Sequence, residues 1–224
     1  MNRYGRTFAA WRAAAQPQWD AYTRHPFVEG LRDGTLPQSG FLAYLVQDYL
    51  FLKNFSRAWA LAVVKAGDLD EMRACSATVH TLLDHEMGLH VQTCARAGMD
   101  AKMLANAQEA VTNIAYTRYV LEAGYSGDFL DLLAALMPCV IGYGEIGLRL
   151  QAEAAPDTPY REWIDTYAGA EYQAACIAAG ELLDSAIRKR LGHAAQENPR
   201  WAALSERFAT ATRLEVAFWE LGRS

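Results

Sequence analysis

The segment from residue 128 to 154 most restricts how this chain can fold, because it is apolar on almost every face of a helix. Its hydrophobic side chains fall at all angles around the helix axis: Phe129, Leu130, Leu132, Leu133, Leu136, Met137, Val140, Ile141, Ile146 and Leu148. Such a helix must be buried on all sides, so other helices have to surround it. A bilayer would need about 20 apolar residues in a row, and Asp131, Pro138 and Glu145 interrupt this run. We therefore expect a buried central helix and no membrane span.

The rest of the chain follows the same helical period, and no segment alternates as a β-strand does. Breakers divide it into expected helices at about 6–23, 37–66, 69–97, 105–124, 128–154, 159–192 (interrupted near Ala168-Gly169) and 197–222, with a short helix after 23. The first helix should end before His25-Pro26, since a residue that precedes proline disfavours the α conformation. No linker rich in Gly, Ser or Pro separates these segments. We expect one all-α domain, a single helical bundle that covers residues 1–224.

Composition limits the classes of function. Hydrophobic residues make up 52% of the chain, and 21 basic against 26 acidic residues give a formal charge of −5. This balance and the lack of a basic cluster argue against nucleic-acid binding, which needs grouped Lys and Arg. The N-terminus carries no apolar signal-peptide core. The four cysteines are widely spaced, at Cys75, Cys94, Cys139 and Cys176, which favours reduced thiols in the cytoplasm over a disulfide framework or a zinc site.

Cys139 is a thiol inside the most apolar part of the chain. Pro138 precedes it and lacks the amide that a helix interior uses, so we expect the helix to kink or restart there. Cys139 would then lie in the first turn of a new helical half, where free amides favour a thiolate. The alternative is an ordinary buried cysteine, which is inert. Tyr143 lies one turn later on the same face.

Two carboxylates also stand in aromatic surroundings. Asp48 is flanked by Tyr44, Phe51 and Phe55, and Glu215 by Phe218 and Trp219. A carboxylate in such a place either pairs with a buried base or receives the N–H groups of a ligand. Apolar surroundings should also raise the pKa of Glu215 and make it a plausible proton donor. The alternative is an ion pair with an arginine such as Arg57 or Arg213.

Glu86 and His90 share one helix face, and a carboxylate with a histidine at this spacing can bind iron in helical bundles. A di-iron site needs matching Glu and His pairs on other helices, and the remaining histidines do not supply them. We expect no metal here, and assign the pair to capping and helix–helix hydrogen bonds.

An ordered series of short motifs resembles the thiaminase II (TenA) family, helical proteins of the heme-oxygenase-like fold that bind no heme. The motifs cover most of the chain: His25-Pro26-Phe27-Val28 with Gly34-Thr35-Leu36-Pro37, Gln47-Asp48-Tyr49 with Phe55-Ser56-Arg57-Ala58, Ala115-Tyr116-Thr117, Leu136-Met137-Pro138-Cys139 with Tyr143, Trp163-Ile164-Asp165-Thr166-Tyr167, and Glu215 with Phe218-Trp219. Each motif alone is weak, but the ordered set is specific. Cys139 resembles the thiol of the family's cysteine-bearing branch.

The resemblance implies an aminopyrimidine aminohydrolase. Such an enzyme hydrolyses 4-amino-5-aminomethyl-2-methylpyrimidine, and in many members thiamine as a slower substrate, to the hydroxymethylpyrimidine of thiamine salvage. It needs no cofactor. The resemblance also implies a homotetramer, and a small-molecule aminopyrimidine or thiamine as the only other partner.

The resemblance assigns roles to residues by position. Cys139 matches the nucleophile and Glu215 the acid/base, while Asp48 matches the ligand of the ring's amino edge. Tyr116, Tyr143 and Tyr167 match pocket tyrosines. Phe51 departs from the tyrosine that many relatives carry one turn after the aspartate; it keeps the stacking surface but lacks the hydroxyl.

Two other functions compete with this one. An oxidase on the same fold would require a di-metal ligand set or a more basic pocket. A non-catalytic thiamine- or pyrimidine-binding protein would need Asp48 and the aromatic residues, but would have no use for Cys139 together with Glu215.

Overall fold

The computed structural model describes residues 3–223, apart from the side chains of residues 85 and 89, and within these residues every regular element is a helix. The helices are α1 (Arg6–Ala14), α2 (Gln16–Thr23), α3 (Pro26–Asp33), α4 (Gln38–Lys65), α5 (Leu69–Thr81), the π-helical η1 (Leu82–Glu86), α6 (Met87–Arg96), α7 (Ala101–Ala105), α8 (Val111–Ser126), α9 (Phe129–Glu153), α10 (Arg161–Ala168), α11 (Ala170–Leu191), the 3-10 turn η2 (Ala195–Glu197), α12 (Arg200–Trp219) and the 3-10 turn η3 (Glu220–Gly222). The expected all-α class is confirmed.

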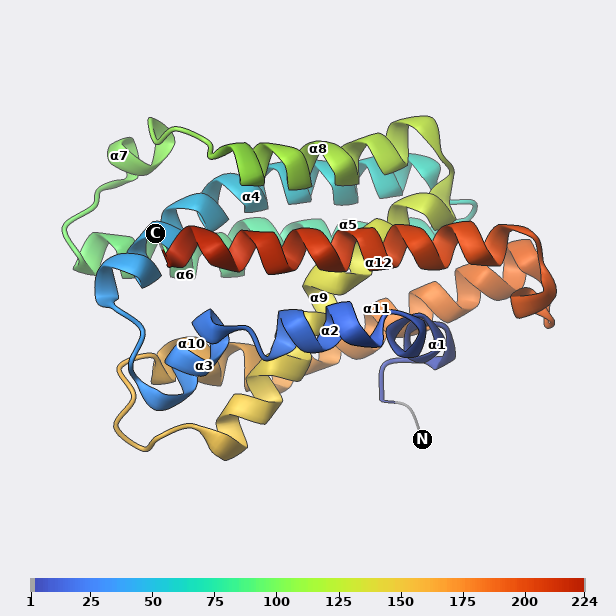
Figure 1. The fold of residues 1–224 in the computed structure, drawn as a ribbon. Helices are drawn as coiled ribbons and strands as arrows, with labels where there is room; N and C mark the ends of the chain where they lie inside the picture. The colour runs from blue at the N-terminus through green and yellow to red at the C-terminus, as the bar shows by residue number, and fades with distance from the viewer. Residues whose placement is uncertain (1–2, 224) are drawn as a thin grey trace.

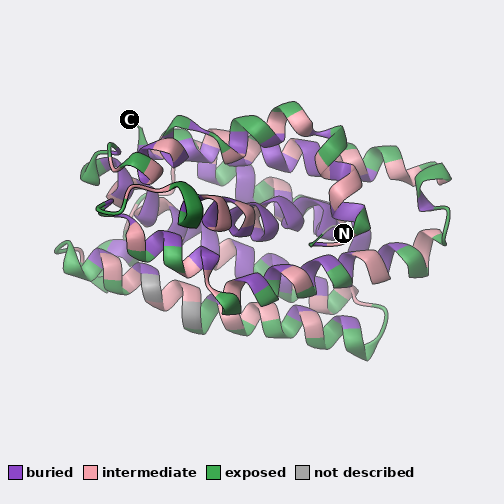
Figure 2. Cartoon of the chain, turned by 90° about the horizontal axis from the view of Figure 1, so that it is seen from below, coloured by how far each residue is buried: buried purple, intermediate pink, exposed green. Residues whose placement is uncertain are grey.

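Helix α9 is the central helix that its sequence predicts. It packs against α8, α10, α11 and α12, and Figure 1 shows it crossing behind α12. By length and composition α9 could cross a membrane, but 83% of its apolar window is buried inside the fold. Figure 2 shows the same division for the whole chain, with buried residues on the inner faces of the helices and exposed residues outside. We conclude that α9 is the core helix.

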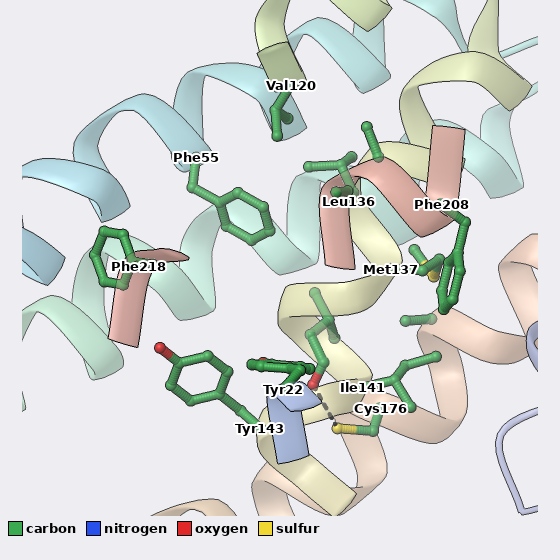
Figure 3. Packing of buried hydrophobic residues seen from close by; sticks show 14 of the residues in the cluster. Tyr22, Phe55, Val120, Leu136, Met137, Ile141, Tyr143, Cys176, Phe208 and Phe218 are labelled. Atoms are coloured by element: carbon green, nitrogen blue, oxygen red, sulfur yellow. Dashed lines mark hydrogen bonds between the residues drawn. The ribbon is translucent and has the colours of Figure 1, made fainter. Parts of the chain in front are cut away.

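The packing around α9 is close. Figure 3 shows Leu136, Met137 and Ile141 of α9 beside Phe208 of α12 and Cys176 of α11. The Cys176 thiol donates to the Val140 carbonyl at 3.2 Å. This packing holds the side chains of α9 in fixed directions.

Several expected boundaries are confirmed, namely those of α4 and α9 and the interruption between α10 and α11 at Gly169. The single helix expected over 6–23 is wrong, because the chain breaks at Ala15 and Pro17 lies in the first turn of α2. Proline has no amide to continue the helix from α1, but it fits a first turn. The helix expected over 69–97 contains the π-helical turn η1, and the one expected over 105–124 begins only at Val111.

Helices α4, α8 and α12 lie on one side of α9, with α12 antiparallel to α4 and α8 (Figure 1). All three contact α9, and α8 also contacts both α4 and α12. Most of the polar side chains discussed next lie among the apolar residues on the inner faces of these helices.

Candidate active site

The structure brings the predicted site residues to one region of the interior. Asp48 and Phe51 come from α4, Tyr116 from α8, Cys139 and Tyr143 from α9, Tyr167 from α10, and Glu215 from α12. All are buried except Cys139, whose side chain is partly accessible. Their catalytic and binding roles remain predictions, but their proximity is a property of the fold.

Glu215 is a buried carboxyl with two neutral hydrogen-bonding neighbours. The Tyr116 hydroxyl donates to its Oε1 at 2.7 Å, and the Cys139 thiol is in hydrogen-bonding range. Burial raises the pKa of Glu215 to about 8, against the opposing hydrogen bond from Tyr116 and with a further contribution from the charge of Asp48. The expectation of a raised pKa is confirmed, and at neutral pH Glu215 is mainly a proton donor.

The expected activation of Cys139 by a helix start is wrong. Helix α9 continues through Pro138 from Phe129 to Glu153, so Cys139 lies mid-helix, far from free amides. Burial raises the pKa of the thiol well above its ordinary value, and the charges of Glu215, Glu86 and Asp48 raise it further. Cys139 is therefore a neutral thiol in the resting protein, and it needs a base to become a nucleophile.

Asp48 pairs with a histidine that lies 42 positions further along the chain. The His90 Nε2 lies 2.5 Å from Asp48 Oδ2, and the Tyr44 hydroxyl donates to the same oxygen at 3.1 Å. Asp48 Oδ1 has no hydrogen-bond partner among the described residues. One oxygen is thus held by the protein, and the other is left for a ligand.

The hydrogen bonds of His90 indicate its charge. Its Nδ1 lies 2.9 Å from the Glu86 carbonyl oxygen, which can only accept, and its Nε2 faces a carboxylate. An imidazole that donates through both nitrogens is protonated. Burial opposes this charge, but the Asp48 carboxylate outweighs burial and raises the pKa of His90 to about 9. The pair carries no net charge, which makes its burial tolerable.

One wall of the site is aromatic and apolar. The Phe51 ring lies 4.9 Å from that of Tyr116, 5.1 Å from that of Phe55 and 5.3 Å from that of Phe218, measured between centroids. These distances are typical of interacting aromatic pairs. Phe51 therefore contributes a flat surface against which a planar ring can stack.

A second wall of the site is aromatic but carries hydroxyls. The Tyr143 ring lies 4.9 Å from that of Tyr167, whose ring lies 4.5 Å from that of Trp163. The Tyr44 hydroxyl lies 3.4 Å from that of Tyr143, and the Tyr167 hydroxyl donates to Glu86 Oε1 at 3.0 Å. Hydroxyls thus link Asp48 to Tyr143 through Tyr44, and the ring contact between Tyr143 and Tyr167 leads on to Glu86.

Sequence reasoning missed two members of the site. Glu86 and His90 were assigned to helix–helix hydrogen bonds, which His90 does make, but the pocket position of both residues was not predicted. The shared helix face was the available signal. The arginine pairs considered for the two carboxylates are wrong, since Arg57 contacts Asn54 and Arg213 contacts Glu206. Among the described residues no cluster of three or more His, Cys, Asp or Glu is arranged to hold a metal.

A small cavity borders the site. It has a volume of about 70 Å³, and His90 and Trp163 form part of its wall. A hollow of about 630 Å³ lies between α1 and the end of α11, and none of its lining residues belongs to the site. The larger hollow contains neither Cys139 nor the carboxyls that lie near it, so it is separate from the candidate site.

Comparison with solved structures bears on the fold. A solved structure of a TenA family transcription regulator from Silicibacter sp. is 57% identical, with a TM-score of 0.96 over 98% of this chain and 97% of that chain. A domain of unknown function from Shewanella denitrificans, at 14% identity, has a heme oxygenase-like fold and superposes with a TM-score of 0.59 over 96% of this chain and 90% of that one. The expected fold is therefore confirmed.

Sequence comparison gives a functional relative. The aminopyrimidine aminohydrolase of Halalkalibacterium halodurans is 39% identical over 209 residues, which are 92% of this chain and 91% of that protein. A family model described as TENA/THI-4/PQQC matches residues 12–223. On the match to nearly its whole length, the chain belongs to the TENA/THI-4/PQQC family.

Proposed function

We propose that this protein is an aminopyrimidine aminohydrolase of the thiaminase II type. It hydrolyses 4-amino-5-aminomethyl-2-methylpyrimidine to the hydroxymethylpyrimidine and ammonia in thiamine salvage, with thiamine as a second substrate. The name of the relative from Halalkalibacterium halodurans supports the reaction class.

The observation that carries the proposal is a thiol beside a protonated carboxyl, facing a carboxylate with a free oxygen. Cys139 and Glu215 are in hydrogen-bonding range, and both interact with the charge of Asp48. A protein that only bound the ring would need Asp48 and the aromatic walls. It would not need a thiol next to a proton donor.

The chemistry follows from the electronic structure of the ring. The exocyclic carbon on C5 releases its amine only when an electron pair is available at C5. Glu215 gives its proton to N1 and takes the thiol proton, while the Cys139 sulfur adds to C6, between N1 and C5. The resulting electron pair expels the amine, water adds to the exocyclic methylene, and the thiol leaves. The raised pKa values of both groups suit this exchange, because neither must be charged before the substrate binds.

The remaining residues orient the ring. The free Oδ1 of Asp48 accepts from the ring amino group, and His90 and Tyr44 hold the carboxylate in place. Phe51 on one side and Tyr143 on the other provide stacking surfaces. Fixing the ring between these groups aligns C6 with the sulfur, which is a large part of the catalytic effect.

Chromatographic turnover of the aminomethylpyrimidine, beside thiamine, tests the proposal. We expect wild type to release the hydroxymethylpyrimidine, and Cys139→Ser to lose at least about 100-fold in rate because nucleophilic catalysis is removed. Cys75→Ala is the matched control, since Cys75 is buried in α5 beside Glu71 rather than in the site. A folded wild type that turns over neither compound would contradict the proposal.

A non-catalytic pyrimidine-binding protein is the second candidate. The name of the relative from Silicibacter sp., a TenA family transcription regulator, favours a regulatory binding role. Tight binding of the ring without turnover, unchanged in Cys139→Ser, would establish this function instead.

A further inference from the structure

Glu86 is a carboxyl in the site that the proposed reaction has not yet used. It ends the π-helical turn η1, where the helix widens between α5 and α6. Turns of this kind occur preferentially at functional sites, because the extra residue redirects nearby side chains. Here the turn aims the Glu86 carboxyl at Tyr167 while the Glu86 carbonyl accepts from His90.

The carboxyl of Glu86 receives no hydrogen bond from a basic group in the described part of the chain: the His90 imidazolium lowers its pKa, but its two N–H groups face Asp48 and the Glu86 carbonyl. Among the described residues its only side-chain hydrogen bond is the one that Tyr167 donates to Oε1 at 3.0 Å, and no lysine or arginine pairs with it. Glu86 keeps partial exposure, but burial is the largest influence on its pKa, and a carboxyl largely withdrawn from water without such a partner is costly. Retaining it in this position is explained if a ligand supplies the missing donor.

The order of groups around the substrate ring tells where that donor would be. With N1 at Glu215 and the amino group on C4 at Asp48, the intervening atoms are C6, which faces Cys139, and C5, which carries the aminomethyl group. The amine therefore lies between Cys139 and Asp48. Glu86 lies on this side of the site. Tyr167 donates to its carboxyl and packs against the Tyr143 ring, and the Tyr143 hydroxyl lies 3.4 Å from that of Tyr44, which donates to Asp48. The charge of Glu86 also raises the pKa of Cys139.

Glu86 and Glu215 approach Cys139 separately. The charge of each carboxyl raises the pKa of the thiol. Glu215 adjoins Tyr116, and Glu86 adjoins Tyr167. The two carboxyls thus serve different sides of the ring.

We propose that Glu86 binds the amine of the substrate, as a primary ammonium, and then accepts the proton of the attacking water. The inference rests on the proposed function and assigns the leaving-group side of the site. The ligand chemistry is a primary ammonium on a methylene next to an aminopyrimidine ring.

Protons and electrons balance in this reaction. The substrate amine is an ammonium at neutral pH, as a lysine side chain is, so the C–N bond breaks with its electron pair leaving on ammonia. Water then forms the C–O bond to the methylene, and its proton goes to the Glu86 carboxylate. Glu86 passes that proton to the ammonia, which departs as ammonium. No oxidant, reductant or second substrate is required.

The ionisation of Glu86 falls in the working range of pH. Burial raises its pKa to about 7, His90 lowers it, Asp48 raises it and the Tyr167 hydrogen bond lowers it. The titratable groups that interact with it are Tyr44 and Asp48 from α4, His90 from α6, Cys139 from α9, Tyr167 from α10, and Tyr172 and Cys176 from α11. Ammonium binding should therefore strengthen as pH rises through about 7.

A matched pair of ligands tests the inference without turnover. In Cys139→Ala, the dissociation constants of the aminomethylpyrimidine and the hydroxymethylpyrimidine are measured by calorimetry at pH 6 and pH 8. We expect a preference for the ammonium ligand of at least about tenfold at pH 8, as a charge-assisted hydrogen bond provides, and a smaller one at pH 6. Adding Glu86→Gln should abolish the preference, whereas adding Asp48→Asn should weaken both ligands alike.

Two further measurements test the role of Glu86 without the double variant. Tyr167→Phe removes a hydrogen bond that lowers the pKa of Glu86, so the midpoint of the ammonium preference should move to higher pH. In the otherwise wild-type enzyme, the fall of kcat on the acid side of pH 7 should disappear with Glu86→Gln. These variants also cover the case in which the double variant Cys139→Ala/Glu86→Gln does not fold.

The outcomes separate the inference from the proposed function. Wild type that turns over the substrate, with a ligand preference and a kcat profile unchanged by Glu86→Gln, overturns the role of Glu86. An ammonium preference that depends on Glu86 in a protein without turnover supports the amine site and overturns the hydrolase reaction.

Discussion

Replacing Glu215 by glutamine should stabilise the fold at neutral and alkaline pH while it removes the proposed activity. Glu215 is 1% exposed, and burial raises its pKa from 4.5 to about 8. Above the lower value the unfolded chain gives up this proton and the folded protein keeps it. The folded state therefore loses stability as pH rises, until the carboxyl ionises in the fold as well. A glutamine of the same shape has no proton to lose.

The size of the effect follows from the two pKa values. At pH 5 ionisation of this carboxyl lowers the free energy of the unfolded chain only slightly. At pH 8 it lowers that free energy by nearly the full amount that the two pKa values allow. Wild type should therefore lose on the order of 3 kcal/mol of unfolding free energy between pH 5 and pH 8 that Glu215→Gln retains. The amide oxygen can still accept from Tyr116, so the variant should lose little packing.

Urea unfolding of both proteins at pH 5, 6, 7 and 8 measures this difference. The matched control is Glu206→Gln, on the same helix but 68% exposed and paired with Arg213, for which the change should stay within about 0.5 kcal/mol. Parallel stability curves for wild type and Glu215→Gln would refute the reasoning, since they would mean that Glu215 ionises as readily in the fold as in water.

Three further predictions test the packing, the buried pair and the assembly. His90→Leu leaves Asp48 buried without its cationic partner and should cost about 3–5 kcal/mol in urea unfolding, with partial recovery in the double variant Asp48→Asn/His90→Leu; an unchanged midpoint in the single variant would mean that Asp48 is not charged in the fold. Gly142→Ala places a Cβ in steric overlap with Cε1 of Tyr22 and should cost about 1–3 kcal/mol. Gly88→Ala, whose Cβ meets nothing within 4 Å beyond its own helix, should lose nothing, so equal melting temperatures of the two variants would contradict the close packing of Tyr22. We also expect a homotetramer of the 24.8 kDa chain, which light scattering at micromolar concentration checks and a stable monomer would disprove.

The course of the main helices could be predicted because it depends on local pattern. Helix α9 is apolar on all sides, and helix packing then requires partners on every face. The residues that end α9 and α4 affect the backbone only within one turn. Both helices therefore match their expected bounds within a residue or two. Pro17 was an equally local signal, and overlooking it merged α1 with α2.

Pro138 shows where a local rule fails. Proline removes one backbone hydrogen bond and commonly ends a helix, yet α9 continues through it. Packing of α9 against α4, α8, α10, α11 and α12 outweighs the loss. Because α9 continues, Cys139 lies mid-helix, where no free amides stabilise a thiolate. The thiolate expected from a helix start is therefore not favoured.

The sequence alone determined the fold class, the central helix and the identities of the thiol and carboxyls, because these depend on hydrophobic period and on motifs read within single helices. Only the tertiary structure decided which side chains pair with the thiol and carboxyls, and whether these groups are protonated. His90 meets Asp48, Tyr116 meets Glu215, and Tyr167 meets Glu86 across long separations in the chain. A pKa depends on burial and on charges within a few ångströms, and those neighbours exist only once the helices have packed.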